Sequence, residues 1–189
     1  MEIISQINGE IYQNQKYKAD LEWWVLGNMT KILNNASLPY PSYAEKREPP
    51  DADFESFNQN NKLFKWIEIT EVLEPDRKRS KEYKNGSREM SEQPNIELWQ
   101  SLKQRILDKL NKDYGVDCWL LIYFDIIYGH ISHYGTWHSG LLNNVSSWIQ
   151  SGELSFSDCQ FEQILILNSS GKALVSIYPR MKVISAEIL

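Results

Sequence analysis

The sequence predicts an α/β domain in which helices cover a mixed β-sheet. Two observations lead to this prediction. Segments with apolar residues at intervals of three and four alternate along the chain with short runs rich in β-branched and aromatic residues, which are typical of strands. The chain also has 189 residues, 42% of them hydrophobic and 24% charged. This length and composition suit one domain, residues 1–189, with a complete core.

The first half of the chain predicts one helix and a hairpin. An apolar stripe at helical spacing runs from Tyr17 to Asn35. Four prolines in SLPYPSYAEKREPP then exclude regular structure. The segment DADFESF follows as a short strand, NQNN as a turn and Leu63–Leu73 as a longer strand. Because the polar link is short, the two strands should pair as an antiparallel hairpin.

The second half predicts two helices and three strands. The polar segment EPDRKRSKEYKNGSREMSEQP is expected to face solvent, and an amphipathic helix should run from Ile96 to Leu110. The nearly continuous apolar run VDCWLLIYFDII predicts a strand that is buried on both faces. A helix around 141–149 is expected next, followed by the strands FEQILIL and ALVSIYP on either side of the turn NSSGK.

Composition and charge limit the kinds of binding partner but do not identify one. The net charge of −5 argues weakly against a protein that coats nucleic acid, although a local basic patch can still contact it. No apolar run reaches the length of a membrane span, and the first residues lack the features of a secretory signal, so a cytoplasmic protein is expected. Cys118 and Cys159 lie far apart in the sequence and are expected to be reduced thiols of the core.

One strand carries an unexpected acid. In LFKWIEITEVL, Glu68 stands where an apolar side chain would be expected. Alternation places Glu68 and Thr70 on one face and Ile67 and Ile69 on the other. A carboxylate at this position is therefore either solvated or functional.

The hairpin brings further acids towards Glu68. If directly opposed residue numbers sum to 119 or 121, Asp51 and Asp53 share its face. A four-residue link pairs Phe57 with Lys62 and predicts a sum of 119, with Asp51 opposite Glu68 and Asp53 diagonal to it. Clustered carboxylates repel one another unless a cation joins them, and oxygen ligands suit Mg²⁺ or Mn²⁺. A slip of one residue would instead turn the acids to solvent as ordinary surface groups.

The segment PPDADF and the following strand with WIEIT resemble the PD-(D/E)xK nucleases of the restriction-endonuclease-like superfamily. The resemblance implies a core of helix, hairpin or meander, helix and strand over residues 17–127, and 128–189 would be an elaboration. It implies that Asp51 or Asp53 is the first acid, that Glu68 is the second and that Glu22 adds another. In that family such carboxylates hold a divalent metal that activates water against a phosphodiester bond.

The sequence departs from the family at the lysine. Two residues after the second acid stands Thr70, whose hydroxyl cannot replace an ammonium ion beside a developing negative charge. Either the basic residue has moved, with Lys78 or Lys81 as the candidates, or catalysis is lost. By the same resemblance, the backbone carbonyl of Ile69 completes the metal coordination.

The three histidines lie together in GHISHYGTWH as His130, His133 and His138. They could bind zinc together with Asp125, although the spacing matches no standard zinc pattern. One of them could instead contact phosphate or act as a general base. A third interpretation, which we favour, is that they cap the next helix, pack on aromatic neighbours or face water.

These observations favour a Mg²⁺- or Mn²⁺-dependent nuclease that acts on DNA rather than RNA. An inactive relative of the same fold, serving as a binding or interaction protein, is the alternative, because fold does not determine function. An α/β protein without this relationship is a third interpretation. A homodimer is also left open, since many nucleases of this fold pair to cut both strands.

Overall fold

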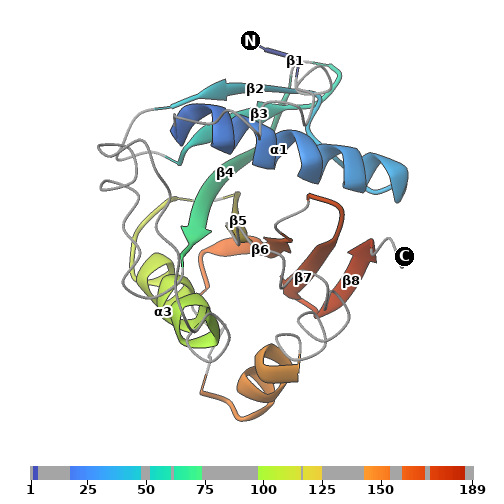
Figure 1. The fold of residues 1–189 in the computed structure, drawn as a ribbon. Coiled ribbons are helices and arrows are strands. Elements are labelled where there is room, and N and C mark those ends of the chain that lie inside the picture. Colours follow the sequence, from blue (N-terminus) through green and yellow to red (C-terminus); the bar gives the residue numbers. More distant parts are fainter. Residues whose placement is uncertain are drawn as a thin grey trace, which may run out of the picture.

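The protein is described here from a computed structural model that covers residues 2–3, 18–47, 52–60, 62–73, 98–115, 117–124, 143–153, 159–168 and 171–185. Its strands form an eight-stranded sheet in which spatial order follows chain order (Figure 1). The strands are β1 (Glu2–Ile3), β2 (Tyr43–Lys46), β3 (Phe54–Phe57), β4 (Leu63–Val72), β5 (Cys118–Phe124), β6 (Phe161–Leu167), β7 (Leu174–Tyr178) and β8 (Lys182–Ser185). The helices are α1 (Lys18–Asn35), α3 (Leu98–Leu110) and a helical segment over residues 143–150.

The sheet is mixed, as the sequence predicts. Strands β1 to β4 pair antiparallel, β4 to β6 pair parallel, and β6 to β8 pair antiparallel again. Parallel neighbours need a crossover connection. The described part of the first crossover contains α3, and that of the second contains the helix 143–150.

The two faces of the sheet carry separate cores. Figure 1 shows α1 on one side and both crossover helices on the other. On the α1 side, Leu26 and Met29 pack with Ile67 of β4. On the α3 side, Leu102 and Ile106 pack with Val72. All seven residues of β5 are buried, which confirms the prediction of a strand covered on both faces.

Among the described residues, no helix combines the length and apolar character required to cross a membrane.

Some elements differ from the sequence prediction. Strand β2 forms inside the proline-containing segment that was expected to be irregular, because its four residues lie between the prolines and pair with β3. The short strands β1 and β8 at the two ends of the sheet order were also not predicted. Strands of two and four residues carry too little alternation to be recognised.

The predicted hairpin is present, but its predicted register is wrong. Phe54 pairs with Ile67, whereas Phe57 pairs with Leu63 after a bulge. The turn is longer than NQNN, because the N–H of Asn58 donates to the carbonyl of Lys62 at 2.9 Å and its side chain accepts the N–H of Lys62 at 3.1 Å. The pairing sum is therefore 121 rather than 119 from Phe54 to Ser56, before the bulge.

Candidate active site

The carboxylate of Glu68 lies inside the protein. Strand β4 pairs with β3 on one side and β5 on the other, and Glu68 is only 6% exposed. Its neighbours Ile67 and Ile69 belong to the core on the α1 side, whereas Val72 belongs to the core on the α3 side. Alternation therefore directs Glu68 and the equally buried Thr70 towards α3. The interpretation of a solvated hairpin face is wrong.

A lysine and a tyrosine contact this carboxylate. Lys109, in the last turn of α3, forms an ion pair with Oε1 of Glu68. The hydroxyl group of Tyr114, just beyond the helix, donates to the same oxygen at 3.2 Å. The ammonium group of Lys109 also donates to the Tyr114 hydroxyl oxygen at 3.2 Å. The three side chains form a closed triangle in which the buried negative charge is paired and hydrogen-bonded.

Asp53 brings a second acid to the same place. Phe54 opposes Ile67, so the residue before Phe54 comes opposite Glu68 on the side of the sheet facing α3. The Asp53 carboxylate accepts the backbone N–H of Ile69 at 2.8 Å through Oδ2. It is thereby held beside the backbone of β4 next to Glu68.

The charges of both acids affect two neighbouring neutral groups, the phenol of Tyr114 and the thiol of Cys118. Burial raises the pKa of the Tyr114 phenol well above its usual value, and the charges of Glu68 and then Asp53 raise it further. Burial, followed by the charge of Glu68, raises the pKa of the Cys118 thiol to about 12, and Asp53 contributes in the same direction. Both acids therefore act on the same small volume. The phenol and the thiol remain protonated at neutral pH, so Cys118 is no thiolate nucleophile.

Gln160 hydrogen-bonds to the backbone of both Lys109 and Tyr114. Its side-chain oxygen accepts the backbone N–H of Tyr114 at 3.0 Å, and its amide nitrogen donates to the carbonyl of Lys109 at 3.3 Å. Gln160 directly precedes β6 and is partly buried. One side chain thus attaches the end of α3 and the following loop to the sheet.

The sequence-predicted residues fall into three groups. Asp53, Glu68 and Thr70 meet on the α3 side, with the backbone of Ile69 beside them. Glu22 does not join them: it lies in α1, pairs with Lys46 of β2 on the opposite side of the sheet and is 1% exposed. The others lie outside the described residues: Asp51, Lys78, Lys81, Asp125 and the three histidines.

The sequence did not identify Lys109, Tyr114 or Gln160. A signal for Lys109 was nevertheless available, because it follows Leu102 by seven residues and Ile106 by three, which places a charge on the buried stripe of α3. Tyr114 and Gln160 carry no comparable local signal, since only the tertiary structure brings them together.

The donor set suits a hard divalent cation. Asp53 and Glu68 offer carboxylate oxygens, the ligands that Mg²⁺ prefers, and Mg²⁺ usually takes only one or two protein carboxylates and keeps several waters. The described part of the chain contains no group of three or more His, Cys, Asp or Glu side chains arranged to hold a metal. A pair of carboxylates fits Mg²⁺ or Mn²⁺, whereas a structural zinc site needs four ligands.

No family model, no curated protein and no solved structure matches this chain. The function must therefore be argued from the site. Its distinguishing features are two acids on one side of the sheet and a lysine, supplied by a helix, against one of them.

Proposed function

We propose that the protein is a metal-dependent nuclease that hydrolyses phosphodiester bonds, in DNA rather than RNA. The observation that carries the proposal is the meeting of Asp53, Glu68 and Lys109 on one side of the sheet. Paired carboxylates provide a cation site, and a buried ammonium group provides positive charge for a phosphate group. Phosphoryl chemistry needs both, because negative charge develops on the phosphate oxygens.

The order of the elements supports the same proposal. A helix (α1), a meander (β2, β3 and β4), a second helix (α3) and a further strand (β5) follow one another. This is the order that the resemblance to the PD-(D/E)xK nucleases implies for residues 17–127. The first acid directly precedes β3, and the second lies within β4.

Lys109 accounts for the missing lysine of the motif. Thr70 takes the usual lysine position but has no charge. Lys109 reaches the same acid from α3, and its side chain is only 14% exposed. An ammonium group held in such a poorly hydrated place interacts strongly with an anionic phosphate. We therefore assign the displaced basic role to Lys109 in place of Lys78 or Lys81.

Each side chain has a role in the proposed hydrolysis. A divalent cation, when bound, lowers the pKa of a coordinated water and offsets the phosphate charge. Asp53 and Glu68 would hold it, with the Ile69 carbonyl as a third ligand by resemblance. Lys109 would stabilise charge on the scissile phosphate. Tyr114, which remains protonated, would keep Glu68 oriented by donating to Oε1.

One observation favours an inactive binding protein as the second candidate. Oε1 of Glu68 already accepts hydrogen bonds from both Lys109 and Tyr114. These contacts satisfy a buried carboxylate without any ligand. In this interpretation the triangle stabilises the fold, and the protein acts by binding a partner.

Calorimetric titration of Mg²⁺ and Mn²⁺, together with cleavage assays on plasmid and single-stranded DNA, tests the proposal. We expect saturable metal binding and cleavage in the wild type, and loss of both in Asp53→Asn and Glu68→Gln. Glu22→Gln is the matched control, because it removes a buried carboxylate charge on the other side of the sheet. Metal binding without cleavage of any nucleic acid would favour the inactive protein, and absence of metal binding would refute the metal-dependent nuclease.

A further inference from the structure

Two segments of this acidic chain contain no acidic residue. Residues 163–186 hold three basic residues and no Asp or Glu, and residues 23–44 hold one lysine and no Asp or Glu. The chain as a whole has 25 acidic and 20 basic residues. Stretches of this length without an acid therefore depart clearly from its average composition.

The fold packs these two segments together. Helix α1 contacts β8, and Ile184 of β8 packs against the core on the α1 side. Gly171, in the turn between β6 and β7, lies so close to α1 that an added Cβ would stand 2.8 Å from Cγ of Asn28. Their basic residues consequently belong to one region of the molecule.

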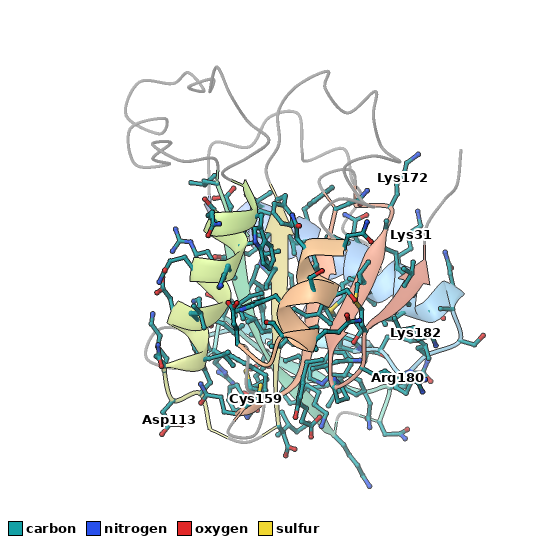
Figure 2. All side chains as sticks on the ribbon, turned by 90° about the horizontal axis from the view of Figure 1, so that it is seen from below. Lys31, Asp113, Cys159, Lys172, Arg180 and Lys182 are labelled. Atoms are coloured by element: carbon teal, nitrogen blue, oxygen red, sulfur yellow. The ribbon has the colours of Figure 1, made fainter. Side chains whose placement is uncertain are left out.

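We call this region the basic edge and define it by Lys31, Lys172, Arg180 and Lys182. All four residues are exposed. Figure 2 shows them along one side of the molecule, away from Asp113 at the end of α3. Within the part of the chain that the structure describes, Lys31, Arg180 and Lys182 form no ion pair with an acid.

The basic edge is extended. Lys182 pairs with Ser176, and Lys172 lies four residues before Ser176 in the chain, or roughly 13 Å at the rise of a strand. One phosphate group cannot bridge that distance. A row of exposed cations over such a length matches a repeating anion, and electrostatic attraction of this kind needs no shaped pocket.

We propose that the basic edge binds the phosphate backbone of a nucleic acid at a place separate from the cleavage site. The choice of nucleic acid among polyanions rests on the proposed function. Lys182 and Ile184 share the α1 side of β8 by alternation, whereas Glu68 faces α3. Four strand spacings of about 4.8 Å also separate β8 from β4. The edge would therefore anchor a stretch of the substrate away from the bond that is cut.

Fluorescence anisotropy with labelled duplex and single-stranded DNA in EDTA tests this anchor at several salt concentrations. Affinity falls as salt rises, and each lost phosphate contact reduces the steepness of log affinity against log salt by about one. We therefore expect Lys31→Gln and Lys182→Gln each to reduce this steepness by about one. The double variant should reduce it by about two and bind several-fold more weakly.

Lys62→Gln is the matched control, because Lys62 is an exposed lysine in the turn between β3 and β4. It should bind DNA with the slope of the wild type, and every variant should keep the melting temperature of the wild-type protein. A double variant with an unchanged slope overturns the proposal. So does an equal loss in Lys62→Gln, or lysine-dependent binding to phosphatidylserine vesicles by a protein that does not bind DNA. Because EDTA prevents cleavage, DNA binding through this edge without hydrolysis in Mg²⁺ would refute only the proposed nuclease activity.

Discussion

The two faces of the sheet each hold a buried glutamate paired with a lysine. On the α1 side, Glu22 is 1% exposed and Lys46 is 32% exposed at the side chain. On the α3 side, the corresponding values are 8% for Glu68 and 14% for Lys109. Burial and pairing are therefore alike, and neither property alone distinguishes a functional acid from a structural one.

The neighbours make the difference. Lys46 lies over the ring of Phe54, with its ammonium nitrogen 4.9 Å from the centroid, which is a packing contact. Glu68 instead has Asp53 beside it, held on the backbone N–H of Ile69, and the Tyr114 hydroxyl on the same oxygen as Lys109. A second carboxylate nearby disfavours the charged form of both acids unless a cation is present. This extra acid, rather than the ion pair, identifies the α3 side as the candidate site.

The largest expected effect is a difference in DNA cleavage between variants of Lys109 and Lys46. Lys109→Met should lower kcat/KM for DNA cleavage by about 100-fold or more, because it removes a positive group from the place proposed for the scissile phosphate. Lys46→Met should leave cleavage within about twofold of wild type, since surface and structural changes away from the site act mainly on stability. Initial rates of plasmid nicking in Mg²⁺ measure both.

Stability provides the control for this pair. Removing one partner of a buried ion pair typically costs about 3–5 kcal/mol, so both variants should lower the free energy of unfolding in urea. Equal losses of cleavage in two folded variants would show that Lys109 has no role beyond that of Lys46. Loss of cleavage explained entirely by unfolding of Lys109→Met would lead to the same conclusion.

The contrast also explains how far the sequence predicted the site. The meeting of Asp53 with Glu68 depended only on parity, because pairing sums of 119 and 121 place both acids on the same face. It therefore survived the bulge that made the predicted register wrong. Lys109 depended instead on where the last turn of α3 lies against β4, whereas the sequence indicated a displaced lysine only in the segment that directly follows the motif.

The same reasoning holds for the fold. Helices and long strands have local periodicity, so α1, α3, β4 and β5 were predicted near their observed bounds. Strand β2 was missed because its four residues are recognised by pairing with β3 rather than by pattern. Glu22 was included by the expectation that the preceding helix supplies another acid, and nothing in its local sequence revealed which side of the sheet α1 covers.

A smaller effect is expected at the residue that positions Lys109. Gln160→Met removes two hydrogen bonds and should lower kcat about threefold to tenfold with little change in KM, at about 1 kcal/mol for a hydrogen bond. Gln160→Glu keeps the acceptor for the Tyr114 N–H and should recover part of the loss. Gln163→Met, two residues into β6, is the control and should behave as wild type. A fall in stability without a change in kcat would make Gln160 purely structural.

The last expected effect is on alkaline stability and leaves cleavage at neutral pH aside; both groups involved lie beside Glu68. The fold raises the pKa of Cys118 from its usual 9.0 to about 12, and that of Tyr114 above its usual 10.0. A group with a raised pKa stabilises the fold fully below its unfolded-state pKa, and this contribution is lost as pH rises through the folded-state value. The free energy of unfolding should therefore decline from pH 9 to 12. Urea titrations should show a shallower decline for Cys118→Ala from pH 9 and for Tyr114→Phe from pH 10. Slopes identical to wild type in both variants would mean that neither burial nor the two acids raises the pKa of these groups, and the α3 side would then differ from the α1 side by less than its geometry implies.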